Sequence, residues 1–414
     1  MAKSKYNIIN ELQLNNIGLL ELLVAMYPVL SGYSSFLPLQ LLLLVVIIGL
    51  VILKKGKTNF LRVKEFTWFV SFVLIHEFIW LFVIRQVHGY FINSIIQLIV
   101  YFVGVLIITP GINWNKLVGS INWVTIICMI GMFYHAALVA MGNKVGQIPL
   151  PFLEVSRQDV EYARPLGFFP EPGAYAGFML YPLFIALSKR QWWWSLTIAI
   201  GILASTSTNG IALLFIMITF TMLSSKIGVW SKVLLLILGV VLVFLLFNND
   251  YFSGSVEKIE RELDVEHLSQ SVRMAQGFYV VSTMDPGDFV LGVPYGNAYD
   301  YAKGEGIVGN FVVYGDGEDA SIYMTTIWQL LLRYGVVGLF LYLILYIKAG
   351  KRAKGLWPLI ACSMLRIITA ADFISSTFVM NMIFIYTYIR YVSNLQMKNQ
   401  IYENSSIDTH KVGK

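Results

Sequence analysis

The chain has little charge and almost no cysteine. Only 13% of its 414 residues are charged, 57% are hydrophobic, and the mean hydropathy is +0.68. Because a soluble domain carries about 25% charged residues, this balance excludes an ordinary soluble protein and predicts an all-α polytopic membrane protein. The two cysteines, Cys128 and Cys362, both fall in apolar stretches. A disulfide framework and a cysteine-based metal site are therefore not expected.

The sequence also lacks internal repeats and low-complexity tracts. Residues 1–16 are polar and the first apolar run is followed at once by another, so no cleavable signal peptide is expected. The stretch from Asn394 onward is polar, and we expect it to be a mobile tail.

Apolar runs near 20 residues predict about twelve membrane-spanning helices in a single integral membrane domain, residues 1–414. Within the region 192–224, Ser205-Thr-Ser-Thr-Asn-Gly210 is either a tight outer turn or a break in one long span. The predicted spans are 17–35, 36–53, 66–84, 91–109, 118–140, 172–188, 192–207, 208–224, 230–247, 321–347, 356–371 and 372–393.

Charged residues divide unevenly between the two sides that these spans define. The outer loops hold 17 of the 24 Asp and Glu residues but only 8 of the 30 Lys and Arg residues. The positive-inside rule therefore makes the other side, which carries both termini, cytoplasmic. Two outer loops, about 141–171 and 248–320, are long enough to hold extracytoplasmic chemistry.

The most distinctive loop segment is Arg164-Pro-Leu-Gly-Phe-Phe-Pro-Glu-Pro-Gly173, where the first long loop re-enters the membrane. A guanidinium such as that of Arg164 binds phosphate oxygens bidentately, and a helix N-terminus adds N–H groups and a positive dipole end. The segment therefore indicates a phosphate-bearing, lipid-linked ligand. The structural alternative is that Arg164 pairs with Glu161 or Glu171 and staples the loop.

The prolines of this segment predict where the next helix starts. The residue before a proline avoids the helical region, so the loop is expected to be extended. Pro172 suits the first turn of a helix, and Glu171 lies near its cap. Small residues keep the helix start slim, which lets a headgroup or a neighbouring helix approach closely: Gly173, Ala174, Ala176 and Gly177.

This segment, continued through Ala174-Tyr-Ala176, resembles the R-x-x-G-x-F-x-E-P-[small]-x-x-A motif of Wzy-type O-antigen and capsular polysaccharide polymerases. Thr206-Ser-Thr-Asn-Gly210 is similar to the Ser/Thr-rich turn that the family places one span later. The resemblance continues in the large loop and closes after it, covering about residues 155–345 in the family's order: Ser271-Val-Arg273, Pro286–Gly296 and Leu330–Leu339.

The resemblance implies glycosyl transfer at the outer face of a bacterial cytoplasmic membrane, by a protein similar to the GT-C class of membrane glycosyltransferases. A growing glycan on undecaprenyl pyrophosphate would move onto the sugar end of another lipid-linked repeat unit. The lipid-linked oligosaccharide is then both donor and acceptor, with no nucleotide sugar, metal or other cofactor. A chain-length regulator is a further partner that the family allows, and no nucleic acid is expected.

The family's functional residues are arginines of the two long outer loops, which correspond here to Arg164 and Arg273. Two guanidiniums would hold the charge of the leaving pyrophosphate without a metal. The acceptor hydroxyl needs a base, for which Glu171 is one candidate. Asp316, Glu318 and Asp319 are others, although such a cluster is also typical of a solvated turn. The candidates for substrate binding are Gly167, Gly173, Arg333, Arg366 and Asp319.

The large loop is predicted to contain an amphipathic helix, Ser255–Ala275, with an apolar side and i,i+4 ion pairs. Glu266 falls on the face of Arg273, so a surface ion pair is the alternative to a phosphate contact. His267 points elsewhere, and we interpret it as a surface histidine.

Several ionisable groups fall inside predicted spans, where a charge needs a partner or a water-filled cavity. His76 and Glu77 are adjacent in one span, and Glu77 is a candidate partner of Arg333. Arg333 precedes Tyr334-Gly335, where a helix could break and present this cation to a cavity. Arg366 could pair locally with Asp372 or face substrate.

Two alternatives to a polymerase remain open. A related O-antigen ligase would carry a histidine just before the final Gly-x-x-Gly span. Here that place falls near Tyr323-Met324, so the histidine is absent, which argues against a ligase. A flippase or transporter of lipid-linked oligosaccharides should show charges through many spans and similar features on both sides. The long loops of this chain lie all on the outer side, which favours a transferase.

Overall fold

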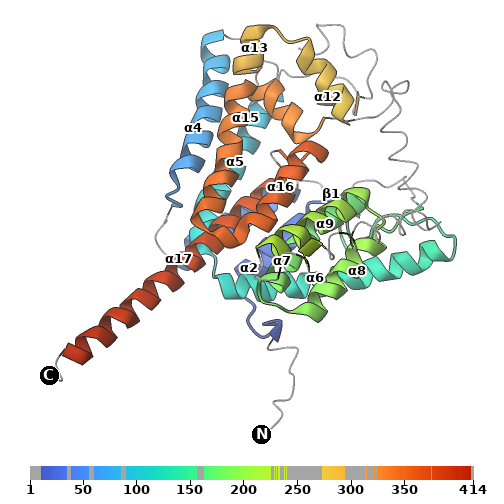
Figure 1. The fold of residues 1–414 in the computed structure, drawn as a ribbon. Coiled ribbons are helices and arrows are strands. Elements are labelled where there is room, and N and C mark those ends of the chain that lie inside the picture. The colour runs from blue at the N-terminus through green and yellow to red at the C-terminus, as the bar shows by residue number, and fades with distance from the viewer. Residues whose placement is uncertain are drawn as a thin grey trace.

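The computed structural model of the chain is built mainly of helices (Figure 1). It describes residues 11–34, 39–55, 60–84, 90–155, 163–224, 273–293, 324–373 and 375–411, with 313–314, 321–322 and a few positions between 228 and 239. In the first half of the chain the helices are α2 (Leu19–Leu30), α3 (Leu39–Lys55), α4 (Lys64–Ile79) continued by the π-turn η1 (Trp80–Ile84), α5 (Tyr90–Gly111), α6 (Trp114–Ala140), α7 (Pro172–Ser188), α8 (Trp192–Ala204) and α9 (Thr208–Leu223).

The second half of the described chain contains two short helices and three longer ones. The short helices are α12 (Arg273–Ser282) and α13 (Pro286–Leu291), and the longer ones are α15 (Thr326–Arg352), α16 (Trp357–Thr369) and α17 (Ser376–Lys411), with the 3₁₀ turn η7 (Lys354–Leu356) before α16. Two small antiparallel ladders join β1 (Tyr33–Ser34) to β2 (Glu154–Val155) and β3 (Val313–Tyr314) to β4 (Ser321–Ile322).

Each predicted span coincides with a helix, except 230–247, which lies largely outside the described residues. Within the described ranges, three helical stretches are long and apolar enough to cross a membrane by length and composition: Lys64–Phe82, Trp114–Ala140 and Thr326–Arg352. Shorter apolar helices are also present, among them α2, α3, α7, α8 and α9. The fold is therefore consistent with an all-α membrane protein.

The C-terminal segment, which we expected to be a mobile tail, is helical. The last helix, α17, continues to Lys411 and projects away from the other helices (Figure 1). Between Asn394 and Lys411 the sequence contains neither proline nor glycine, the residues that stop a helix most strongly. A polar composition alone therefore did not end the helix.

If the helices alternate in direction across the membrane, certain helix ends should lie on the same side of it. The observed contacts between helix ends join such ends. At the predicted cytoplasmic side, Arg352 near the end of α15 forms an ion pair with Glu65 in the first turn of α4, with 2.7 Å between Nη1 and Oε1. At the other side, Ser31 Oγ after α2 lies 2.7 Å from Ser376 Oγ at the start of α17. The contacts agree with the alternation, and the side of the membrane stays a prediction.

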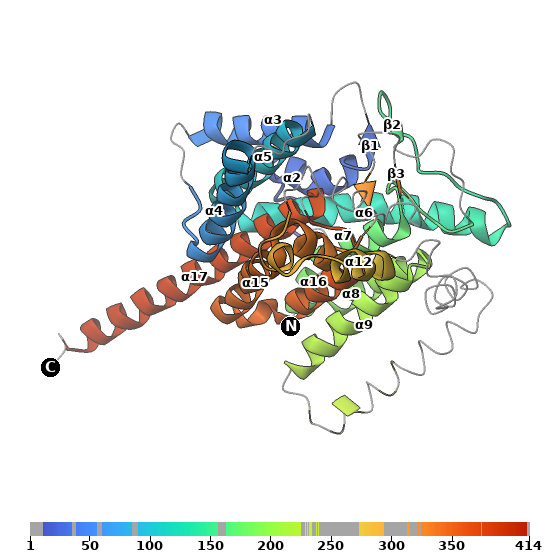
Figure 2. The ribbon, with the colours of Figure 1, turned by 90° about the horizontal axis from the view of Figure 1, so that it is seen from above.

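Helix α15 is broken at Gly335, as the sequence predicted. Gly335 has φ 60° and ψ −167° inside the helix, a conformation that glycine adopts without a Cβ penalty. A Cβ at this position would overlap the backbone of Val290 in α13. The break therefore lets α13 approach α15 closely, and Val293 N–H donates to the Leu332 carbonyl at 2.7 Å. Helices α12 and α13 lie over this end of the bundle (Figures 1 and 2).

Candidate functional site

The Arg164–Gly173 segment forms a compact loop against α6. Gly167 adopts φ +59°, a left-handed conformation that favours glycine. Its N–H donates to Nδ1 of His135 at 3.0 Å, and its carbonyl accepts from Ile148 N–H at 2.9 Å. Both backbone polar groups of Gly167 are thus engaged within the protein. His135 is an anchor of this loop that the sequence did not single out.

Two polar side chains fix the loop to the end of α2. The amide Nε2 of Gln147 donates to the carbonyls of Phe168 at 3.0 Å and Gly32 at 3.1 Å. The Tyr33 hydroxyl donates to the Ile148 carbonyl at 2.6 Å. Arg164 lies half-buried at the start of the loop, so its guanidinium retains access to the surface.

The start of α7 matches its sequence prediction. Glu171 is the N-cap residue with φ −147° and ψ 149°, and Pro172 occupies the first turn. The side chain of Glu171 makes no capping hydrogen bond to the helix. Among the described residues, a Cβ built on Gly173 would meet only Ser207 Oγ, at 3.9 Å. The described part of the structure therefore leaves space beside Gly173 at the N-terminus of α7.

The Ser/Thr-rich segment is a tight turn between α8 and α9, which decides between the two alternatives that the sequence left open. Thr206 adopts φ 50°, and Ser207 caps α9 by accepting from Gly210 N–H at 3.1 Å. Ser205, Thr206 and Ser207 are all buried. Because Ser207 lies beside Gly173, two segments that carry the resemblance are neighbours in space.

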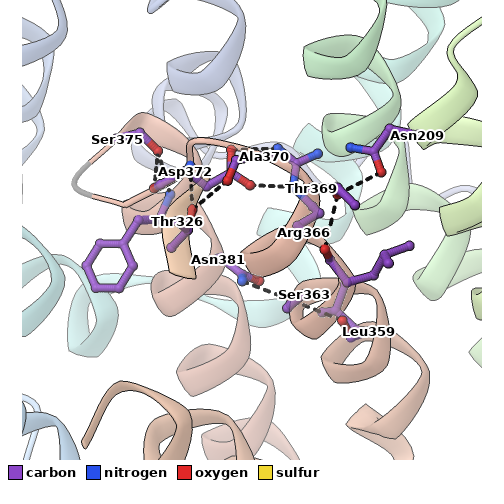
Figure 3. Close-up of polar contacts among 12 residues, drawn as sticks. Asn209, Thr326, Leu359, Ser363, Arg366, Thr369, Ala370, Asp372, Ser375 and Asn381 are labelled. Carbon is purple, nitrogen blue, oxygen red and sulfur yellow. Dashed lines mark hydrogen bonds and ion pairs between the residues drawn. The ribbon is translucent and has the colours of Figure 1, made fainter. Parts of the chain in front are cut away.

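Arg366 lies at the end of α16 in a buried network of polar groups (Figure 3). Its Nε lies 2.6 Å from Oδ2 of Asp372 and its Nη2 lies 2.7 Å from Oδ1, a bidentate ion pair. The Asp372 N–H donates to the Thr326 hydroxyl at 2.8 Å, which donates to the Ala370 carbonyl at 2.7 Å. The local pair predicted for Arg366 is therefore present, and Thr326 joins the start of α15 to the segment between α16 and α17.

The remaining nitrogen of Arg366 points toward α7. A Cβ at Gly177 would overlap the guanidinium, so the slim face predicted for α7 admits this side chain. Among the described residues, Nη1 of Arg366 has no hydrogen-bond partner although it is buried. A cavity of about 20 Å³ beside it is lined by Gly177, Tyr181 and Asn381 among others, which is room for one water molecule. Asp372 compensates the charge of Arg366, so this arginine is held mainly by the protein.

A second polar region lies where α4 packs against the break in α15. The His76 ring is 5.3 Å from the ring of Tyr334, which follows Arg333. Glu77 is buried, and its Oε1 lies 4.0 Å from His76 Nδ1. Arg333 is half-buried in the adjacent turn of α15. The helices of Glu77 and Arg333 are thus neighbours, while the ion pair between these two residues stays a prediction.

Within the large loop, the structure describes α12 and α13 but few other residues. Arg273 begins α12, which packs against α15 through Gly277 and Trp328 and also contacts α16. Most of the predicted helix Ser255–Ala275, with His267, lies outside the described residues, as do Asp316, Glu318 and Asp319. The convergence of Arg164 with Arg273 on one ligand therefore stays a prediction.

Comparisons with known protein families, with curated proteins and with solved structures found no match for this chain. The class that the fold supports is an α-helical membrane protein with a polar junction at the ends of α7, α8, α9, α15 and α16. The resemblance to Wzy-type polymerases rests on the quoted motifs and their order along the chain.

Proposed function

We propose that this chain is a membrane polysaccharide polymerase of the Wzy type, with about twelve spans and a GT-C-like arrangement. It would transfer a growing glycan from undecaprenyl pyrophosphate to another lipid-linked repeat unit, at the outer face of a bacterial cytoplasmic membrane. Both termini would lie in the cytoplasm. The substrates reach the site laterally from the membrane, since both carry a lipid.

The observation that carries the proposal is the open space at the N-terminus of α7. It lies between the Arg164 loop and the Ser205–Gly210 turn, because Gly173 faces Ser207 at the start of α9. Helix N-termini stabilise anions through their N–H groups and the helix dipole. Half-buried Arg164 belongs to the same short loop and adds a guanidinium fork for phosphate oxygens.

These groups suit the chemistry of a glycosyl pyrophosphate donor. The bond between the anomeric carbon and the pyrophosphate oxygen breaks as a bond to the acceptor hydroxyl oxygen forms. The leaving diphosphate gains negative charge, which Arg164, Arg273 and the α7 N-terminus would stabilise. The acceptor proton passes to a base. Glu171 at the N-cap of α7 is the carboxylate that the described part of the loop offers for this role.

The experiment that tests the proposal is a surface-glycan profile of cells with and without this protein. A polymerase predicts that its loss removes long chains and leaves single repeat units on the surface. Loss of all surface glycan would instead indicate a ligase or a flippase. Unchanged long chains would contradict the proposal outright.

A further inference from the structure

A cavity of about 190 Å³ lies beside the first turns of α7. The ends of α2, α3 and α17 form its wall together with one face of α7, and Pro170 of the Arg164–Gly173 segment borders it. A water molecule takes about 30 Å³ in the liquid. The cavity therefore has room for a small organic ring.

The lining of this cavity is polar but neutral. Ser31, Gln40, Ser376 and Thr377 supply hydroxyl and amide groups, and Phe178 and Tyr181 supply aromatic surface. Among the described residues that line the cavity, none carries a charged side chain. An anion or a cation would lose its hydration there without a counter-charge. A neutral ligand with many hydroxyl groups would find donors, acceptors and an apolar face.

The polar groups on one wall are already held in place. Ser31 Oγ and Ser376 Oγ share a hydrogen bond of 2.7 Å. Gln40 Nε2 donates to the Ser31 carbonyl at 2.9 Å, and Gln40 Oε1 accepts from the Tyr101 hydroxyl at 2.9 Å. Groups fixed before binding lower the entropic cost of ordering them around a ligand.

The cavity also adjoins the Arg366–Asp372 ion pair and the N-terminus of α7. Tyr181 and Thr377 line both this cavity and the small one that contains Arg366. Ala174 belongs to its wall, one residue after Gly173 at the α7 N-terminus. A neutral compartment thus lies directly beside the groups that suit a diphosphate.

We propose that this cavity binds one uncharged sugar ring, the acceptor end of the lipid-linked repeat unit. This inference rests on the proposed function for the identity of the sugar as acceptor. The neutral hydroxyl and amide groups would hold the ring, and the α7 N-terminus would keep the donor diphosphate within reach. The two substrates would then occupy adjacent, chemically distinct compartments.

The test uses the purified full-length protein in detergent and a panel of methyl hexosides as probes. At least one hexoside should raise the unfolding temperature saturably, and sodium pyrophosphate should not displace it. Ala174→Phe fills the cavity and should weaken hexoside binding at least tenfold. The matched control is Ala137→Phe on the exposed face of α6, which adds the same ring elsewhere and should bind as wild type does.

A second variant keeps the test decisive if Ala174→Phe does not fold. Thr377→Val removes one hydroxyl without changing the size of the side chain, and hexoside binding should weaken about fivefold. If no hexoside binds to the wild-type protein, or if both variants bind hexoside as tightly as the wild type does, the cavity is not a sugar site. A further outcome is that cells lacking the protein still make normal long glycans while the purified protein binds a hexoside. That result would contradict the polymerase function but support the sugar site.

Discussion

At the scale of single residues, two arginines differ in how they are held. Arg366 is buried and bidentately paired with Asp372, whereas Arg164 is half-buried in a loop. Removing one member of a buried pair leaves an uncompensated charge, which costs more than the pair contributes. The two residues should therefore respond differently to substitution.

Asp372→Ala should destabilise the protein by about 3 kcal/mol, because the Arg366 charge would lose its partner. Chemical unfolding in detergent measures this change. Replacing both residues with apolar ones, Arg366→Met with Asp372→Leu, should cost less than the single substitution. A single variant as stable as wild type would mean that the pair does not compensate a buried charge.

Arg164→Ala and Arg273→Ala should each abolish long glycans while the protein still inserts into the membrane. Cells would then display single repeat units. Arg164→Lys should restore polymer only in part, since an ammonium is a point charge and cannot replace the planar guanidinium fork. Glycans of normal length in both alanine variants would remove the proposed phosphate clamp.

At the scale of elements, the start of α7 carries two glycines with different surroundings. A Cβ at Gly177 would overlap the Arg366 guanidinium, whereas the only described atom near a Cβ at Gly173 would be Ser207 Oγ, at 3.9 Å. The first glycine permits packing between α7 and α16. The second leaves space at a helix N-terminus.

Gly177→Ala should therefore destabilise the protein by about 1–3 kcal/mol, the usual cost of overpacking. Gly173→Ala is its matched control and should leave the unfolding midpoint nearly unchanged. If the donor diphosphate approaches the α7 N-terminus, Gly173→Ala should nevertheless shorten the glycans. Full activity together with full stability in Gly173→Ala would place the donor elsewhere.

The Tyr33 hydroxyl provides a test of how the Arg164 loop is anchored. The Tyr33 hydroxyl donates to the Ile148 carbonyl at 2.6 Å and so joins the end of α2 to this loop. Tyr33→Phe should lower the unfolding free energy by about 1 kcal/mol at neutral pH. Equal unfolding midpoints for both proteins would show that the hydrogen bond to Ile148 contributes nothing.

At the scale of the whole molecule, apolar run length predicted where most helices lie, and proline and glycine predicted local breaks. Pro172 begins α7 and Gly335 interrupts α15 as expected. The sequence did not predict which distant segments contact each other, because hydrophobic periodicity contains no information on packing partners. His135 bonding to Gly167 and Thr326 bonding to Asp372 are examples. The ion pair of Arg366 could be predicted only because its partner, Asp372, follows six residues later in the sequence.

The predicted sidedness can be tested by labelling single cysteines. Asn143 and Lys351 are both exposed, in the first long loop and near the end of α15. A membrane-impermeant maleimide should label Asn143→Cys in intact cells. It should label Lys351→Cys only after the cells have been permeabilised. The native Cys128 and Cys362 are buried, so background labelling should be low. The opposite pattern would invert the predicted orientation.

Glycan synthesis by the purified protein tests most directly whether this chain is a polysaccharide polymerase. The wild-type chain, reconstituted in vesicles, would receive a single radiolabelled repeat unit on undecaprenyl pyrophosphate, with no metal or nucleotide sugar added. A polymerase should produce a ladder of products spaced by one repeat unit, with release of undecaprenyl pyrophosphate, and Arg164→Ala should produce no ladder. A folded wild-type protein that leaves the repeat unit unextended would contradict the polymerase function.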